Sequence, residues 1–241
     1  MLRVYVSDLH IHTCLSPCAD LEMTPSNIVR TAVQAALDII AITDHNSGKN
    51  VSAVVEMAAD FHLTVIPGME VQTKEEVHLL TFFENLETLQ EWDAFILEHL
   101  PDVRNDPDVF GYQPIVDAEG FILSYEHKLL MNSLNLSLEE VVNGVKDLEG
   151  ICIPSHVDRE AFSIIGQLGY IPHGLPIDAV EITTEKKGDM PLGYEFVMSS
   201  DAHFLHDIGA KKTLFFLDLP TLKEIQRALQ GEGGRRIIGL L

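Results

Sequence analysis

The stretch VYVSDLHIHTCLSPCAD, residues 4–20, places polar, metal-binding side chains directly after a short apolar segment. Residues 4–6 are predicted to form a buried strand, and His10 and His12 follow it two positions apart. Residues i and i+2 of an extended chain face the same side, so both imidazoles should point in one direction. Two ligands preset by one rigid segment are typical of a metal centre. The alternative is a buried strand that merely ends in polar, hydrogen-bonded residues.

The rest of the chain alternates between apolar strand-like runs and helix-like segments. Strands are predicted at 39–42, 63–71, 77–83, 150–155, 179–183, 196–200 and 214–217. Helices are predicted at 25–37, 51–62, 86–100, 138–148 and 220–229. Thr24 and Pro25 form a typical helix start, and Ser137 with Glu140 forms a capping box. This alternation predicts a parallel α/β architecture. We expect a single domain over residues 1–241, with an insertion at about 101–135.

Further polar side chains follow the predicted strands, where the sites of parallel α/β barrels are normally built. They are His45, Glu70, His156, Asp201 and His203. His78 instead begins a strand. Only the six residues 72–77 separate it from the preceding strand, which is too few for a helical crossover. A hairpin is therefore predicted, and it would return His78 to the end where Glu70 lies.

Composition limits the classes of function. The chain has 241 residues, 37 acidic against 16 basic, and a formal net charge of −21. Such a charge opposes binding to the phosphates of nucleic acid, so a nucleic-acid partner is not expected. No apolar run is long enough for a membrane span, and the first residues lack the apolar core of a secretory signal. Three cysteines make no disulfide framework and fit a reducing compartment, so a cytoplasmic location is expected.

Histidine and carboxylate ligands without paired cysteines favour Zn²⁺, Mn²⁺ or Fe²⁺ in an open, catalytic site. The candidates exceed the needs of one ion, so two or three ions are expected, with Glu70 as the natural bridge. Asp8 and Asp44 flank these residues. They either orient the imidazoles or hold loops in place.

Several short motifs resemble those of the polymerase-and-histidinol-phosphatase (PHP) superfamily. They are D-L-H-x-H-T from Asp8, T-D-H at Thr43, G-x-E at Gly68, S-H at Ser155 and S-D-A-H at Ser200, with His78 between the third and the fourth. The resemblance implies an α/β fold of the PHP type, a distorted (β/α)7 TIM-like barrel. It also implies a trinuclear metal site that hydrolyses phosphoesters. The family's ligands carry over to His10, His12, His45, Glu70, His78, His156, Asp201 and His203.

The family also uses a ninth ligand soon after the first motif. Asp20 is the best match here, and Glu22 is close enough to compete. Cys14 and Cys18 form no ligand pair in the family pattern, so they are expected to be small buried thiols.

The resemblance leads to a mechanistic hypothesis in which a metal-activated hydroxide attacks the phosphorus of a small phosphate mono- or diester. Arg159, Asp201 and His203 are the candidate catalytic residues. The Arg159 guanidinium can clamp two phosphate oxygens, or it can pair with Asp158, Glu160 or another acidic neighbour. Lys128, Lys186, Lys187 and Lys211 are weaker candidates for the same role.

Two other functions stay open. One is a nuclease or proofreading-type module acting on nucleic acid, and the other is a non-catalytic metal-binding scaffold. The filled ligand positions argue against a scaffold. The segment 101–135 can shape the pocket or serve as an interface. The sequence favours no particular substrate, metal or oligomeric state.

Overall fold

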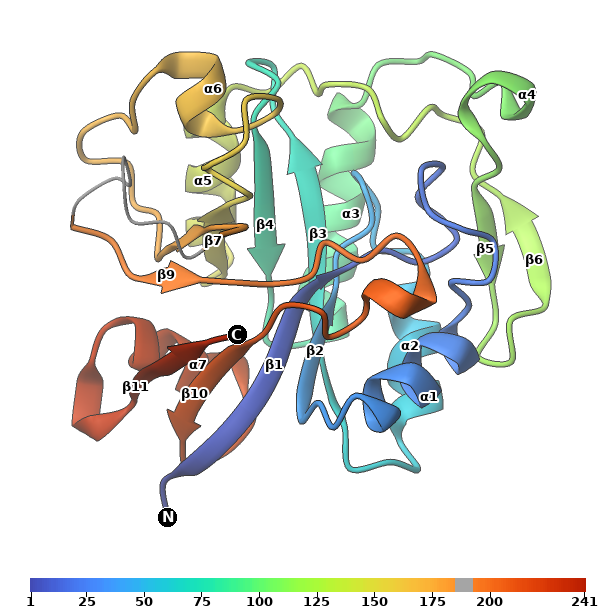
Figure 1. Ribbon diagram of the computed structural model, residues 1–241. Helices are drawn as coiled ribbons and strands as arrows, with labels where there is room; N and C mark the ends of the chain where they lie inside the picture. The colour runs from blue at the N-terminus through green and yellow to red at the C-terminus, as the bar shows by residue number, and fades with distance from the viewer. Residues whose placement is uncertain (185–192) are drawn as a thin grey trace.

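The computed structural model describes residues 1–184 and 193–241. Its main sheet has the strand order β11-β10-β1-β2-β3-β4-β7 and curls into a half-barrel (Figure 1). The fold is thus α/β and of the distorted-barrel type that the motifs predicted. The strands of this sheet are β1 (Arg3–Ile11), β2 (Ile39–Ile42), β3 (Thr64–Gln72), β4 (His78–Phe82), β7 (Ile151–Pro154), β10 (Thr213–Leu217) and β11 (Arg236–Leu240).

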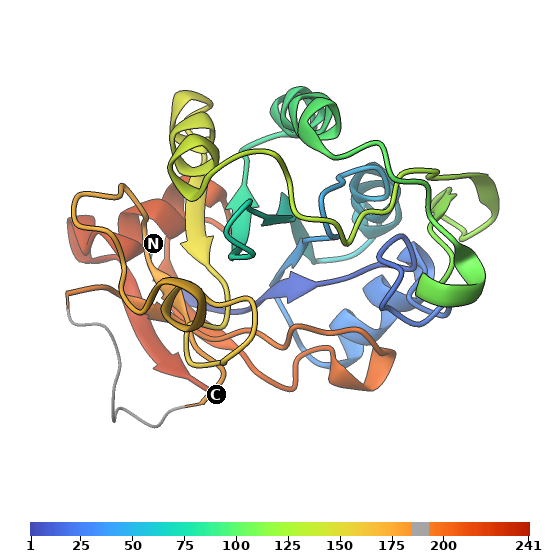
Figure 2. The same ribbon diagram turned by 90° about the horizontal axis from the view of Figure 1, so that it is seen from above.

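Helices cover the outer side of the curled sheet (Figure 2). They include α1 (Pro25–Gln34), α2 (Val51–Ala58), α3 (Leu86–His99), α5 (Leu138–Asp147) and α7 (Leu222–Leu229). Helix α5 begins with the predicted capping box, in which Ser137 accepts from the Glu140 amide and Glu140 accepts from the Ser137 amide. Pro25 begins α1 as predicted, although the Thr24 side chain makes no capping hydrogen bond.

The strand directions place several strand ends at one rim. Strands β1, β2 and β3 are parallel, whereas β3 and β4 form the predicted hairpin with Gln72 opposite His78. Strand β7 runs antiparallel to β4 and therefore regains the direction of β3. Strands β10 and β11 are also joined antiparallel. Within the main sheet, neighbouring strands are thus parallel only from β1 to β3, because the chain reverses at β4 and again at β10.

A short parallel pair, β8 (Val180–Glu181) and β9 (Phe196–Val197), lies beside β7. After β9 the chain returns to β1. The His12 amide donates to the Ala202 carbonyl at 3.0 Å, and the Ala202 amide donates to the His10 carbonyl at 3.1 Å. This exchange brings the segment that carries Asp201 and His203 against the end of β1.

Residues 101–135 form an outer layer with α4 (Pro107–Phe110) and the hairpin β5 (Pro114–Val116) and β6 (Ile122–Tyr125). All four side chains of β6 are exposed, whereas Leu130 and Leu134 are buried in the main core. The reading of this segment as an insertion into a single domain stays a prediction.

The sequence did not predict helix α6 (Ile164–Leu168) or strand β11. The GEGGRR segment contains the short 3₁₀ helix η2 (Glu232–Gly234), and another, η1 (Leu205–Asp207), follows His203. In the described residues, no helix is both long and apolar enough to span a bilayer.

Candidate metal centre

His10, near the end of β1, and His12, directly after it, lie on one face, as their spacing predicts. Both side chains are fully buried, and their Nε2 atoms lie 3.2 Å apart. Ordinary buried histidines hydrogen-bond to unlike partners, so two imidazoles aimed at one point indicate a shared ligand.

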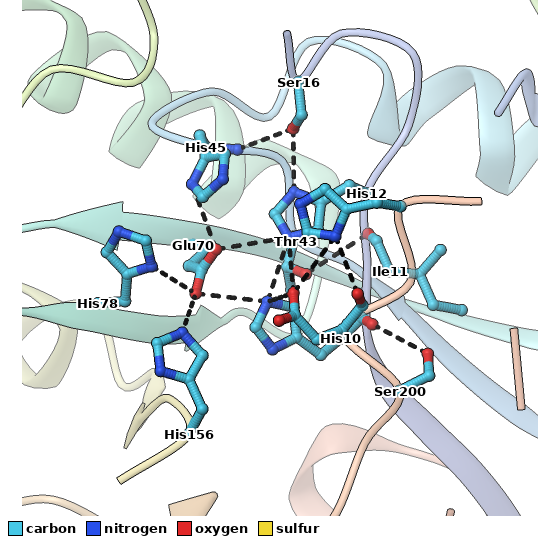
Figure 3. Close-up of polar contacts among 12 residues, drawn as sticks. His10, Ile11, His12, Ser16, Thr43, His45, Glu70, His78, His156 and Ser200 are labelled. Atoms are coloured by element: carbon cyan, nitrogen blue, oxygen red, sulfur yellow. Dashed lines mark hydrogen bonds and ion pairs between the residues drawn. The ribbon is translucent and has the colours of Figure 1, made fainter. Parts of the chain in front are cut away.

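Glu70 lies at the centre of the site (Figure 3). Its two carboxylate oxygens are 3.1–3.5 Å from nitrogens of five imidazoles, those of His10, His12, His45, His78 and His156. Strand β3 brings Glu70 close to its neighbours because Gly68 has no side chain. A Cβ at Gly68 would lie 3.1 Å from the carbonyl oxygens of both Ile42 and Thr81. Burial opposes ionisation of Glu70, yet the surrounding imidazoles hold its pKa well below the usual range.

Asp201 and His203 complete the cluster from the segment after β9. Asp201 Oδ1 lies 3.3 Å from His10 Nε2, and the His203 ring stacks on the His12 ring at a centroid distance of 4.3 Å. Asp201 and His156 both have positive φ angles, 55° and 34°. Non-glycine residues rarely adopt this conformation, and such strain concentrates at functional sites.

The cluster offers three groups of ligand atoms, each with its atoms within 4.8 Å of one another. The groups are His12 with His45 and His203, His10 with His12 and Glu70, and His45 with Glu70 and His78. Nδ1 of His45, Nδ1 of His156 and Oε1 of Glu70 are buried without a hydrogen-bond partner. Unpaired buried polar atoms are costly, and cations would satisfy these donor atoms. The buried His and Glu side chains therefore fit several divalent metal ions.

Asp44 holds the loop that follows β1. Its carboxylate accepts hydrogen bonds from the Thr13 amide, the Thr13 hydroxyl and the Ser16 hydroxyl at 2.6–2.7 Å. Ser16 Oγ in turn accepts from the His45 amide at 3.1 Å and lies 3.0 Å from His12 Nδ1. A proton on Nδ1 of His12 would complete this network and leave Nε2 as a free ligand atom.

Asp8 holds the segment that follows β9 in the same way as Asp44 holds the loop after β1. Its carboxylate accepts from the amide and hydroxyl of Ser200 and from the amide of Gly209. Burial raises the pKa of Asp8 to about 6, although these hydrogen bonds oppose the shift. Of the two roles considered for Asp8 and Asp44, holding loops is the one that their contacts support.

Glu181 is a member of the site that the sequence analysis missed. This buried carboxylate lies 3.1 Å from His10 Nδ1 and accepts from the His156 amide at 3.0 Å. A carboxylate behind a histidine is the usual outer partner of a metal ligand. The available signal was one acidic residue inside the apolar run AVEI, residues 179–182.

The structure brings eight of the nine predicted ligands together and leaves Asp20 aside. The Asp20 amide donates to the His203 carbonyl at 2.9 Å, so its backbone is close to the cluster. Its carboxylate, however, accepts from the Glu22 amide at 2.8 Å. Glu22 itself is exposed. Neither acid is in the ligand groups found among the described residues, although Asp201 and His156, which lie within 3.5 Å of other members of the cluster, are not in them either.

A cavity of about 290 Å³ opens beside the cluster. Besides the predicted ligands it is lined by Cys18, Gln72, Met131, Arg159, Ala161 and Phe162. Arg159 Nη1 donates to Asp201 Oδ2 at 2.6 Å, so its acidic partner is neither Asp158 nor Glu160. The Phe162 ring stacks on His78 with centroids 4.7 Å apart.

The weaker cationic candidates lie elsewhere. Lys128 Nζ donates to the Leu97 and Leu100 carbonyls, which assigns it to holding the end of α3. Lys211 does not line the cavity. Lys186 and Lys187 lie outside the described residues.

Comparison with known proteins identifies the family of this chain. Residues 8–171 match the family model described as "PHP domain". The chain therefore belongs to the PHP family, a family of metal-dependent phosphoesterases.

Individual relatives are distant. Part of the chain is 36% identical to the 5′-3′ exoribonuclease Rnm of Salmonella typhimurium over 75 residues, 30% of this chain and 25% of the relative. The chain spans less than half the length of the curated relatives it matches.

Two kinds of solved structure have similar folds. The lesion-specific endonuclease PfuEndoQ of Pyrococcus furiosus superposes with a TM-score of 0.76 at 21% identity, over 99% of this chain and 58% of the other. Endonuclease Q in complex with a 27-mer duplex carrying an abasic lesion gives 0.78, over 99% and 59%. A putative metal-dependent phosphoesterase of Bifidobacterium adolescentis gives 0.53 at 18% identity, over 82% and 87%.

Proposed function

We propose that this protein is a metal-dependent phosphodiesterase that cleaves nucleic acid at an end or in a short single-stranded segment. The observation that carries the proposal is the ring of buried imidazoles around Glu70, which opens to a cavity. The similarity to endonuclease Q and the local similarity to an exoribonuclease favour a nucleic-acid substrate over the small phosphoester that the sequence first indicated.

We assign the metal ligands to His10, His12, His45, Glu70, His78, His156, Asp201 and His203. Bound divalent ions would supply Lewis acidity and lower the pKa of bound water enough to make a nucleophile at neutral pH. The protein's own part is to hold the ligands in place. Glu181 fixes the His10 ring, and Asp44 fixes the loop behind His12.

Arg159 is the side chain assigned to the substrate phosphate. It lies on the cavity wall and is partly exposed, so its guanidinium can reach a ligand without crossing the core. Its present partner, Asp201, is also a proposed metal ligand. Binding of a phosphate would give the guanidinium a second anion and draw the scissile group toward the ligands.

Size and charge restrict the substrate. A cavity of about 290 Å³ is at the small end for ligand sites and suits one nucleotide. A net charge of −21 weakens any grip on a long phosphate backbone. These two observations also support a second candidate, hydrolysis of a small phosphomonoester or diester.

A substrate panel tests the proposal. The protein, loaded separately with Zn²⁺, Mn²⁺ or Fe²⁺, is assayed on end-labelled single-stranded RNA and DNA, on duplexes with and without an abasic site, and on p-nitrophenyl mono- and diesters. The expected result is shortening of single strands and slow cleavage of the diester. The His10→Ala protein, purified in the same way, identifies any contaminating nuclease.

Three results would count against the proposal. Hydrolysis of the monoester alone supports the second candidate. Bound metal without hydrolysis of any substrate supports the scaffold function. Cleavage that persists in His10→Ala does not come from the proposed metal centre.

A further inference from the structure

Cys18, on the loop after β1, has no assigned role in the proposed metal centre. It lines the same cavity as His45, Glu70, His78, Asp201 and His203, whereas Cys14 and Cys152 are buried away from it. The carboxylate of Asp20, predicted from the sequence as the ninth ligand, is held by the Glu22 amide instead.

The loop is fixed on both sides of Cys18. On one side, Ser16 Oγ accepts from the His45 amide and lies 3.0 Å from His12 Nδ1. On the other side, the Asp20 amide donates to the His203 carbonyl at 2.9 Å. A hydrogen bond from the Ala19 amide to the Ser16 carbonyl, 2.9 Å long, closes the turn between these anchors. Cys18 is therefore held on the wall of the cavity that His45 and His203 also line.

This three-histidine group is incomplete as it stands. Its ligand atoms lie within 4.8 Å of one another, and the buried Nδ1 of His45, which makes no hydrogen bond, lies 3.2 Å from Glu70 Oε2. Three imidazoles leave one position of a tetrahedral ion for a fourth protein ligand or for water. Glu70 faces the same group, but five imidazoles already share its two oxygens.

We propose that Cys18, not Asp20, is the fourth protein ligand of the ion bound by His12, His45 and His203. The proposal rests on the metal-dependent function proposed above and specifies one of its sites. The donor set becomes three imidazole nitrogens and one thiolate. A soft thiolate favours zinc or iron over manganese, so this position should discriminate against Mn²⁺.

Cobalt substitution tests the proposal independently of activity. A thiolate bound to Co²⁺ gives a near-ultraviolet charge-transfer band that imidazole and carboxylate ligands do not give. The Co²⁺-loaded full chain is compared with Cys18→Ser, with Asp20→Asn, and with Cys14→Ser as the matched control from the same loop. Cobalt per chain is counted by mass spectrometry, and circular dichroism checks folding.

The charge-transfer band is expected in the parent protein, in Cys14→Ser and in Asp20→Asn. Cys18→Ser is expected to lose both the band and about one cobalt ion per chain. A thiol titration of the parent protein needs no variant, and bound metal should protect one thiol from a water-soluble disulfide reagent. Bound cobalt without the band, or a band that survives in Cys18→Ser, overturns the assignment of Cys18 and leaves the proposed function intact. Loss of the ion in Asp20→Asn but not in Cys18→Ser restores Asp20 as the ligand. No bound metal in the parent protein overturns both proposals.

Discussion

Two clusters of charged side chains in this protein differ in how completely their carboxylate oxygens are hydrogen-bonded. At the base of the sheet, Glu224 of α7 accepts from Arg227 Nη1, Arg235 Nε and the Asp218 amide, each at 2.9 Å. Each carboxylate oxygen of Glu224 has a donor with a fixed proton. At the other end of the sheet, the ion pairs of Glu70 in the described chain are all with imidazoles, and Oε1 has no hydrogen-bond partner.

The difference separates a cluster that stabilises the fold from one built for a ligand. The Glu224 cluster is electrostatically complete, so binding an ion there would gain little. The Glu70 cluster gathers imidazoles, carboxylates and strained backbone in the interior. Burying these groups destabilises the fold, and a bound cation would offset that cost. Incomplete satisfaction in a buried, well-positioned cluster is thus the mark of the functional site.

The largest effect is expected from His10→Ala, which removes the imidazole that touches Glu70, Asp201 and Glu181. Loss of an outer partner of a metal ligand costs about 10–100-fold, so loss of a ligand should cost activity more than about 100-fold. Steady-state hydrolysis of the best substrate and metal content per chain are measured on protein whose fold is checked by circular dichroism. His206→Ala is the control, because His206 is exposed. Activity within a few-fold of the parent in His10→Ala would contradict the proposed role of this cluster.

Metal removal should have the next largest effect, and on stability. A ligand at a hundred times its dissociation constant stabilises the native state by about 2.7 kcal/mol. For a chain of this size, that corresponds to a fall of about 5–10 °C in melting temperature when a chelator removes the metal. Thermal unfolding is followed with and without chelator, and re-addition of metal should restore the loss. The melting temperature of Glu70→Gln should fall much less on addition of the chelator, because this variant lacks the central ligand. Equal responses of the two proteins would mean that the stabilising ions bind elsewhere.

Glu181→Gln should have a smaller effect on the same cluster. The amide keeps the shape of the side chain but not the negative charge behind His10 Nδ1. Metal affinity, measured by competition with a chromophoric chelator, should fall about 10–100-fold. Glu195→Gln is the matched control because Glu195 is exposed just before β9. A Glu181→Gln protein that binds metal as tightly as the control would reduce Glu181 to a structural role.

Local patterns predicted the parts of this site that local geometry determines. The His10/His12 spacing sets one strand face, and the six-residue connection to His78 forces a hairpin, so both were predictable. The capping box at Ser137 is local in the same way. The fold type followed from PHP-like motifs spread from Asp8 to His203, and residues 8–171 match the PHP family model.

The parts that were missed depend on contacts between distant segments or on competing local bonds. Glu181 faces His10 only because β8 lies beside β7 and β9 leads back to β1, which no local pattern reports. Asp20 stays a prediction as an acidic ligand, and one of its carboxylate oxygens accepts a hydrogen bond from the amide two residues later. Asp commonly makes such a turn, and this signal was present in the sequence.

The smallest effect is expected in the cluster that is already complete. The hydrogen bond and charge of Arg235, with the Asp218 amide, lower the pKa of Glu224 from 4.5 to about 2. As pH falls, Glu224 therefore takes up its proton in the unfolded chain before it does so in the folded chain. Its contribution to the stability of the fold is complete above pH 4.5 and is lost as pH falls toward 2. Because Arg227 is partly exposed, we expect Glu224→Gln to cost only about 1 kcal/mol at neutral pH, measured by urea unfolding. The difference in unfolding free energy between Glu224→Gln and the parent protein should shrink at pH values of about 3. The control is Glu232→Gln, whose exposed carboxylate lies 3.8 Å from Arg227 and which should change stability by less than about 0.5 kcal/mol. A cost that does not depend on pH would mean that packing, and not the charge of Glu224, stabilises this end of the sheet.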